Sequence, residues 1–364
     1  MKRFFLAALA IAAIASCTKN EVTPSDPQEI TYQAVVGKAT KALVETTAYP
    51  TTETFGTVAY LNTDPAQVYI PASEVSYYTA NKYWSTATAY YWPVNGNLTF
   101  YSYSPFNYSE TPSTPIGVSH TATTLSFDNY NVGEHQATDL MVAEVQKNLT
   151  ANNMQITGWV KGVNTIFHHK LSQVVKITFK TVDTQNPESL VDYANGHDGS
   201  SGHEYVAGDQ QYVINSVKFK NLYFTGDYLY NAATTPVTES WTPEGSVTSE
   251  TTWMSTPTNI SSGELVTTKT GSENYLLVLP QTFTNTGSGD ASICVNYSIK
   301  TYIDATNYST ETIETEIPLY NIHTGNKWDM NKKISYEIKM SKHRIYWAPS
   351  VEAWDDTVNP SATI

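Results

Sequence analysis

Apolar and polar residues alternate with a period of two along several segments of this 364-residue chain, and no other sequence feature constrains the fold as strongly. The alternation is clear in residues 175–180, 217–220 and 334–341. Successive side chains of an extended strand point to opposite faces of a sheet, so each segment predicts a strand with one buried face. We expect the following residues to face hydrophobic cores: Val175, Ile177, Phe179, Leu277, Leu279, Ile334, Tyr336 and Ile338.

The lack of a long helical period and the length of the chain indicate an all-β protein with two domains. Turn-forming clusters such as residues 95–97 and 287–290 separate the strand patterns. The 26 tyrosines and a charged fraction of only 15% are typical of a β-rich exported protein. We expect two tandem antiparallel β-sandwich domains with a boundary near residues 161–164. The net charge of −13, without a basic block, argues against nucleic acid as a partner.

The N-terminus predicts export. Lys2 and Arg3 precede an apolar run over residues 4–14, which is typical of a signal peptide and too short to span a membrane. The small residues before Cys17 are similar to a bacterial lipobox, so we expect a lipoprotein signal peptide over residues 1–16 and lipid on Cys17. The alternative is an ordinary signal peptide whose cleavage site precedes a cysteine. With Cys17 lipidated, Cys294 is expected to be an unpaired thiol on a strand.

The segment that follows contains a short amphipathic strand. Ile30, Tyr32, Ala34 and Val36 recur at every second position, so the strand has one apolar face. It lies between a polar tether and a stretch with Lys38 and Lys41 (and Ala42 after it). Removing such a strand would expose a groove that another strand could fill. The pattern alone is equally compatible with a permanent first strand.

Several segments together resemble one family, the fimbrillins or type V pilins. The similar motifs follow the order of the family. Four of them are Phe-Gly-Thr-Val-Ala-Tyr at residues 55–60, Tyr-Tyr-Trp-Pro at residues 90–93 together with the strand pattern at 98–105, Asp-Leu-Met-Val-Ala at residues 139–143 and Leu-Pro-Gln-Thr at residues 279–282. The other three are the strand patterns of residues 167–174, 325–338 and 351–354. Each motif alone is weak evidence for the family. Together, in this order and behind a lipobox, the seven motifs cover nearly the whole chain.

The resemblance implies a fimbrial structural subunit of the outer membrane and cell surface, exported as a lipoprotein and used for adhesion. It implies two transthyretin-like domains, here over residues 42–162 and 163–354. It also implies a trypsin-like protease that removes residues 17–41, so that a strand of a neighbouring subunit fills the groove. The expected cut follows Lys41, before Ala42, with Lys38 as the second choice. Well-known members have arginine at this site, so the resemblance does not identify the protease that matures this chain.

The C-terminal tail, residues 355–364, is a candidate donor strand. Val358, Ala362 and Ile364 recur with Pro360 at every second position, so an extended tail has one apolar edge. The resemblance implies that such tails enter a neighbour's groove. The alternative is a frayed terminus.

Other site hypotheses are weaker. The adjacent His168 and His169 point to opposite faces of a strand and cannot share a metal ion, and His197 and His203 flank a loop that we interpret as solvated. No catalytic motif is present, so we expect no enzyme, cofactor or metal. The alternative function is a cell-surface glycan-binding lipoprotein. Its aromatic platforms would be Trp84, Trp92, Trp241 and Trp253, unless these residues fill the cores.

Overall fold

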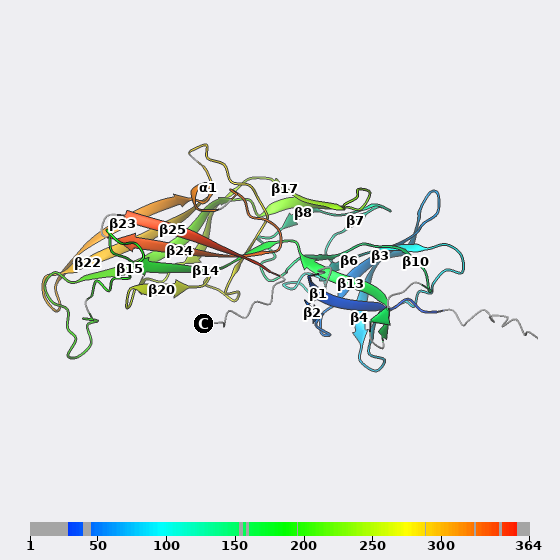
Figure 1. Cartoon of the computed structure of the whole chain (residues 1–364), viewed down its shortest axis with the longest axis horizontal. Helices are drawn as coiled ribbons and strands as arrows, with labels where there is room; N and C mark the ends of the chain where they lie inside the picture. The colour runs from blue at the N-terminus through cyan, green and yellow to red at the C-terminus, as the bar shows by residue number, and fades with distance from the viewer. Residues whose placement is uncertain are drawn as a thin grey trace, which may run out of the picture.

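The computed structural model describes residues 28–38, 45–152, 156–157, 160–194, 196–287, 289–323, 325–341 and 344–354. Within these segments the elements are strands, apart from the short helix α1 (Leu319–Ile322). The molecule is elongated, with the N-terminal strands at one end and the C-terminal strands at the other (Figure 1). The strands form several packed sheets, so the prediction of an all-β, sandwich-like fold is confirmed.

A nine-stranded sheet forms the N-terminal end of the molecule. Its strands are β1 (Tyr32–Lys38), β2 (Glu45–Ala48), β3 (Phe55–Leu61), β4 (Gln67–Tyr78), β5 (Tyr83–Thr86), β6 (Leu98–Ser104), β9 (Met141–Ala143), β10 (Gln146–Leu149) and β13 (Val163–His169). Their order is β10-β6-β3-β4-β5-β1-β13-β9, with β2 beside β1. Because β9 also pairs with β6, the sheet closes into a ring. Closure leaves no free edge along the strands of the ring.

Aromatic side chains fill the interior of this ring. Tyr49 lies at its centre, with ring centroids 5.8 Å from Phe55, 5.3 Å from Trp84 and 5.2 Å from Phe167. Edge-to-face contacts of this kind add to the free energy gained by burying the rings. Phe55, Trp84 and Phe167 belong to three different strands, β3, β5 and β13, and closure of the sheet brings them together around Tyr49.

Two five-stranded sheets form a sandwich at the other end. The first contains β14 (Ser172–Thr181), β20 (Glu264–Thr267), β21 (Leu276–Val278), β24 (Lys332–Ser341) and β25 (Arg344–Ala353). The second contains β15 (Gln210–Leu222), β18 (Thr248–Met254), β19 (Thr258–Asn259), β22 (Ser292–Tyr302) and β23 (Tyr308–Pro318). Between them lies an apolar core that includes Phe219, Trp253 and Trp328. A separate pair, β11 (Ile156–Thr157) and β12 (Val160–Lys161), lies in the connection before β13.

A four-stranded sheet joins the two ends of the molecule, which the sequence did not predict. It contains β7 (Ser119–His120), β8 (Thr124–Asn131), β16 (Thr225–Asn231) and β17 (Thr238–Glu244). Strand β8 pairs with β16, about 100 residues later in the chain, and Phe127 lies opposite Tyr228. Buried residues of β3 and β6, such as Val58 and Tyr101, belong to the same core as the C-terminal sandwich. The two ends are therefore joined through a common core.

The structure differs from the sequence predictions in three details. Strand β13 pairs with β1 and β9, so it belongs to the ring although the predicted boundary falls directly before it. The pairing of β1 with β13 is parallel, as is that of β14 with β24, whereas we expected antiparallel sheets. Of the predicted core residues, only Val175 is not buried, because a bulge between Val174 and Lys176 turns Val174 into the core instead. Cys294 lies on strand β22, as predicted, and within the described residues it is a free thiol, which is buried.

Candidate functional site

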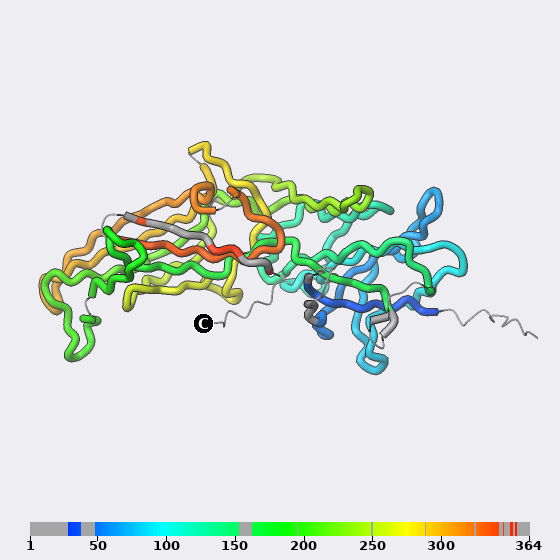
Figure 2. Tube along the Cα trace, in the orientation of Figure 1, coloured from blue at the N-terminus to red at the C-terminus, as the bar shows by residue number. Residues whose placement is uncertain are grey.

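Strand β1 is an interior strand of the ring, bonded along both edges. On one side, Tyr32 to Val36 pair in parallel with Val163 to Phe167 of β13, and Figure 2 shows the two strands side by side. On the other side, β1 pairs with β2 and, at Tyr32, with Trp84 of β5. The bonding continues before the strand, where Ile30 N donates to Tyr90 O at 2.8 Å. The place that β1 occupies between β13 and the pair β2 and β5 is called the β1 slot below.

The apolar face of β1 points into the ring. Ile30, Tyr32 and Ala34 are buried, and Val36 is partly buried against the same aromatic cluster. These are the residues that the sequence places on one face of the first strand. The structure adds that this face is part of the core, so the loss of β1 would open the ring and expose its interior to water.

Tyr32 is the largest side chain that β1 contributes to the ring. Its ring packs edge-on against Phe55 at 5.7 Å and Phe100 at 6.1 Å. Its hydroxyl is buried, and this burial raises the pKa of the hydroxyl despite the opposing effect of the nearby Thr57 side chain. The Tyr32 position of the slot is therefore a large apolar site that accepts an aromatic ring.

Gly162 allows a strand to occupy the slot, a role that the sequence analysis missed. A Cβ atom added to Gly162 would lie 2.9 Å from the carbonyl carbon of Tyr32. Backbone atoms cannot give way as the end of a side chain can, so a larger residue at this position would push β1 away from β13. The sequence signal was present, because Gly162 directly precedes a well-patterned strand, but we interpreted it as a domain boundary.

The processing residues predicted from the sequence lie at or beyond the limits of the described chain. Lys38 is the last residue of β1, and its backbone pairs with Glu45 of β2. Lys41 and Ala42 belong to the connection between these two strands and lie outside the described residues. Cys17 and the tail with Val358, Ala362 and Ile364 also lie outside them.

A buried ion pair holds the chain where it leaves β13 for the C-terminal sandwich. Lys170 is only 5% exposed, and its Nζ lies 2.7 Å from Oε2 of Glu239 on β17. The hydroxyl of Tyr228 donates to the same carboxylate oxygen at 2.8 Å. Trp241 Nε1 donates to the backbone oxygen of Lys170 at 2.7 Å. The joining sheet thus fixes both the side chain and the backbone of this linker residue.

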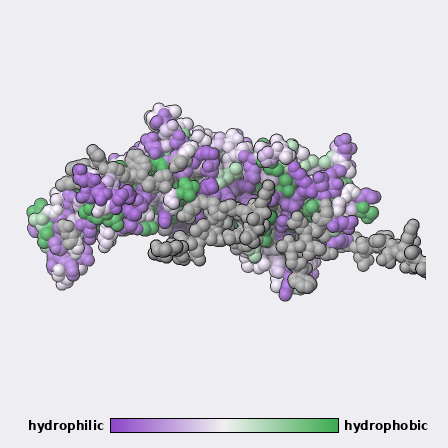
Figure 3. All heavy atoms as spheres, viewed as in Figure 1, coloured by the Kyte–Doolittle hydropathy of each residue, from purple (hydrophilic) through white to green (hydrophobic). Residues whose placement is uncertain are grey.

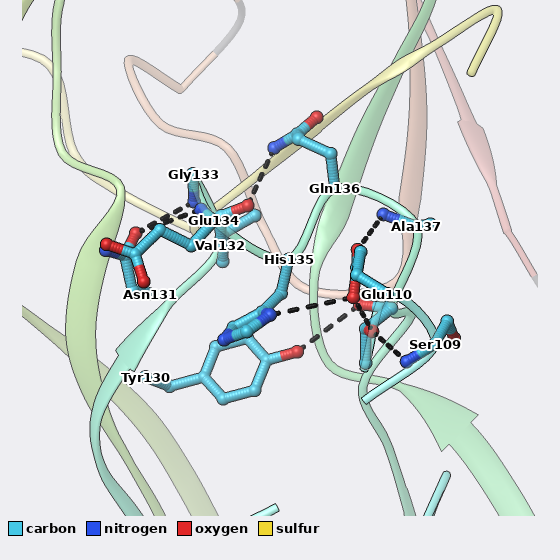
Figure 4. A network of polar contacts seen from close by, with 11 residues as sticks. Ser109, Glu110, Tyr130, Asn131, Val132, Gly133, Glu134, His135, Gln136 and Ala137 are labelled. Atoms are coloured by element: carbon cyan, nitrogen blue, oxygen red, sulfur yellow. Dashed lines mark hydrogen bonds and ion pairs between the residues drawn. The ribbon is translucent and has the colours of Figure 1, made fainter. Parts of the chain in front are cut away.

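A second polar network ties the segment after β8 to both ends of the molecule (Figure 4). Glu110 accepts hydrogen bonds from Ala137 N at 2.5 Å and from Thr138 Oγ1 at 2.6 Å. Two residues earlier than Thr138, the Gln136 side chain donates to Leu277 O at 2.9 Å and accepts from Leu277 N at 3.0 Å. Because Leu277 belongs to β21, this loop links the first half of the chain to the C-terminal sandwich.

We expect the Glu110 network to make stability depend on pH. Burial acts to raise the pKa of Glu110, but hydrogen bonds from Thr138 and Ala137 and the nearby His135 outweigh it, so the pKa lies below its ordinary value. Such a carboxylate stabilises the fold above its unfolded-state pKa of about 4.3, and the contribution is lost as the pH falls through the folded-state pKa. Glu110→Gln should lower the free energy of unfolding by about 1–2 kcal/mol at pH 7.

Thermal denaturation of the two proteins from pH 7 to pH 3 tests this expectation. The difference in melting temperature should shrink as Glu110 of the parent protein takes up its proton. Glu134→Gln is the matched control, since Glu134 is an exposed acid of the same region. A difference in melting temperature between the parent protein and Glu110→Gln that stays constant down to pH 3 would contradict the lowered pKa of Glu110.

The tryptophans considered for glycan binding pack against other rings, and three histidines considered for metal binding each contact a single acid. Trp84, Trp92 and Trp253 are buried, so their rings are not available to a glycan. Trp241 is half-buried, with its ring centroid 6.0 Å from that of Tyr130 and 5.3 Å from that of Tyr228. Three of the histidines contact different acids: His168 contacts Glu144, His169 contacts Asp139 and stacks on Trp354, and His197 contacts Asp209. Within the described residues, no group of three or more His, Cys, Asp or Glu is placed to hold a metal ion.

Fold and site together define a class: a nearly all-β architecture in which the first described strand completes a closed sheet and is joined to the next strand by a lysine-containing connection. The chain belongs to the fimbrillin-like family, whose model matches residues 40–354. No helix in the described part of the chain is long and apolar enough to cross a membrane.

One solved structure supports the fold. The chain is similar to a fimbrial protein from Bacteroides vulgatus, with 17% identity and a TM-score of 0.55, over 82% of this chain and 92% of that chain. It is also similar to a proposed cell adhesion protein from Bacteroides uniformis, with 16% identity, a TM-score of 0.45 and coverage of 90% and 98%. The tip fimbrial protein Mfa3 from Porphyromonas gingivalis, with a C-terminal truncation, matches with 10% identity, a TM-score of 0.30 and coverage of 83% and 94%. No curated protein matches the chain.

Proposed function

We propose that this protein is a structural subunit of a fimbrium, exported as a lipoprotein, matured by proteolysis and polymerised by strand exchange at the β1 slot. Membership of the fimbrillin-like family supports a fimbrial subunit, as does the similarity to a fimbrial protein. The role is structural rather than catalytic, and its partners are other fimbrial subunits at the cell surface. Before maturation, lipid on Cys17 anchors the chain to the outer membrane.

The position of β1 carries this proposal. It is the first strand of the described chain and an interior strand of the ring, and a short connection with Lys41 links it to β2. One cut in that connection would leave β1 held only by hydrogen bonds and side-chain packing. After its departure, the facing backbone groups of β13 and β2 would be unpaired beside an open apolar core. A strand from another subunit can satisfy both, as in other cases of strand addition.

The geometry favours Lys41 over Lys38 as the cleavage site. A protease binds its substrate in an extended, accessible form, and connections between strands are the preferred sites of cutting. Lys38 is inside the hydrogen-bonded ladder of β1 and β2, opposite Glu45. Lys41 lies three residues beyond the end of that ladder. A trypsin-like enzyme that cleaves after lysine is therefore the expected partner in maturation.

The tail remains a predicted donor segment of the mature subunit. Val358, Ala362 and Ile364 lie beyond Trp354, the last described residue, whose backbone N donates to Asn331 O at 3.0 Å. The tail therefore leaves the body of the molecule at the end of β25, next to β24.

Mass-spectrometric N-terminal analysis of the assembled protein tests the processing steps. We expect lipidation of Cys17 in the precursor and an N-terminus at Ala42 in the polymer. Lys41→Gln should reduce the amount of polymer at least tenfold, and Lys38→Gln/Lys41→Gln should abolish it, because β1 then stays covalently attached. Lys333→Gln, on β24 far from the connection, serves as the control. A polymer whose subunits all begin at Cys17 would overturn the proposal.

A further inference from the structure

A small pocket opens between the joining sheet and the C-terminal sandwich. Its volume is about 160 Å³, and three segments line it: Trp241 and Pro243 of β17, residues 280–282 after β21, and residues 327–330 before β24. A cavity of about 150 Å³ in another protein holds one benzene molecule. The pocket therefore has room for a single six-membered ring.

Two tryptophans give the pocket fixed aromatic walls. The half-buried Trp241 is held by its hydrogen bond to Lys170 O and by its packing against Tyr228. Trp328, which also lines the pocket, is buried, and its Nε1 donates to the Tyr336 hydroxyl at 2.9 Å. Both indole N–H groups are therefore used within the fold, and the rings offer apolar surface to a ligand.

A charged pair and a hydroxyl complete the lining of the pocket. Lys327 Nζ lies 2.7 Å from Asp329 Oδ1, and each side chain is about half exposed. The exposed Thr282 pairs with Lys327 through an isolated backbone bridge, which holds the two segments together. Gln281 serves the frame, since its amide donates to Tyr223 O and accepts from Tyr223 N, both at 3.1 Å. The polar groups left for a ligand are those of Lys327, Asp329 and Thr282.

This combination of groups matches the chemistry of a neutral sugar ring. The C–H face of a pyranose is apolar and packs on an aromatic ring. Neighbouring hydroxyls can donate to the carboxylate of Asp329 and accept from the ammonium group of Lys327. A ring without hydroxyls would displace water from this pair without replacing its hydrogen bonds. An acidic sugar would bring a further carboxylate to Asp329 in a protein of net charge −13.

We infer that this pocket binds one neutral pyranose residue of a glycan, with its C–H face on Trp241 and two neighbouring hydroxyls on Lys327 and Asp329. The size of the pocket limits the contact to a single residue of the glycan. The inference goes beyond the proposed function and does not depend on it, because all the lining residues belong to one chain. Binding of a single ring is weak, and repetition of the pocket along a polymer would raise the avidity.

NMR titration of the isotope-labelled protein tests the inference. The indole N–H signal of Trp241 is assigned as the one that Trp241→Phe lacks. The probes are the methyl glycosides of galactose, mannose, glucose and N-acetylglucosamine, with a sialic acid glycoside as the charged comparison and benzyl alcohol as the ring without sugar hydroxyls. We expect at least one neutral glycoside to shift the Trp241 signal with a Kd on the order of 1 mM. The sialic acid glycoside and benzyl alcohol should bind at least tenfold more weakly.

Surface variants locate the binding site. Asp329→Asn keeps the size of the side chain and should weaken binding of the neutral glycoside at least tenfold, because the amide is a poorer acceptor for the sugar hydroxyls. Thr282→Trp places a bulky group at the pocket and should abolish binding. Glu250→Gln is the matched control, since Glu250 forms a similar exposed pair with Lys218, and it should leave the Kd unchanged. The melting temperature of each variant confirms that it is folded.

Four results would overturn the inference. If no neutral glycoside shifts the Trp241 signal, the pocket is not a sugar site. Tighter binding of benzyl alcohol than of every glycoside would make it a site for an apolar side chain of a protein partner. Tightest binding of the sialic acid glycoside would contradict the neutral ligand. Equal affinity of the parent protein and folded Asp329→Asn would contradict the role of the charged pair. All these measurements use the single subunit, so none of them bears on strand exchange at the β1 slot.

Discussion

Replacing Ile338 with aspartate is expected to unfold the C-terminal sandwich. Ile338 lies in β24 between two neighbouring strands, opposite Phe179 of β14 and Trp347 of β25, and it is buried. A carboxylate at this point would be surrounded by the buried apolar side chains of the core. Burial of an unpaired charge together with the lost packing should lower the free energy of unfolding by about 4 kcal/mol or more. Urea denaturation, followed by tryptophan fluorescence, measures the loss.

A control on the same strand separates burial from strand propensity. Ser335→Asp introduces the same side chain three residues earlier, on the opposite, half-exposed face and opposite Lys176 of β14. We expect a change below about 0.5 kcal/mol for this variant. Equal stability of Ile338→Asp and the parent protein would show that the register of β24 is wrong, because a slip of one residue exchanges the two faces.

The second large effect is expected at the junction between β13 and the C-terminal sandwich. Lys170→Met should lower the free energy of unfolding by about 3 kcal/mol, because it leaves the Glu239 carboxylate without its cation in a largely buried site. Glu239→Leu alone should be equally harmful, since Lys170 is even less exposed than its partner. Neither substitution changes a residue of the β1 slot, so the quantity to measure is the free energy of unfolding and not strand exchange.

The double variant decides whether the ion pair itself contributes to stability. Lys170→Met/Glu239→Leu removes both charges, so no uncompensated charge stays buried, and we expect it to recover most of the lost stability. A double variant as unstable as the sum of the two single variants would mean that the two residues do not interact. Lys218→Met, at an exposed pair with Glu250 on β15 and β18, is the control and should leave the urea midpoint of unfolding nearly unchanged.

The face in Figure 3 is mainly hydrophilic, with apolar side chains scattered in small groups. Three of the tryptophans that the sequence offered for glycan binding, Trp84, Trp92 and Trp253, instead fill the ring and the core of the sandwich. Tyrosine and tryptophan thus serve packing at these places, as their pairing across neighbouring strands indicates.

The sequence determined which face of each strand is buried. Alternation along residues 334–341 and from Ile30 to Val36 depends only on neighbouring residues, because the side-chain period of an extended chain is fixed by local geometry. All predicted core residues except Val175 are buried accordingly. The prediction for Val175 is wrong because a bulge inserts one residue into the alternation. A bulge arises from the pairing of two strands and not from the pattern of one.

Only the tertiary structure decided which strands are neighbours. Strand β1 lies beside β13, some 130 residues later, and β8 pairs with β16 of the other half. Many strands of this chain present similar alternating faces, so their side-chain pattern does not select one partner over another. Partner choice depends on closure of the ring and on the shared core, which are properties of the whole chain. For the same reason Lys170, an ordinary lysine in the sequence, becomes a buried ion-pair residue only when β17 lies against it.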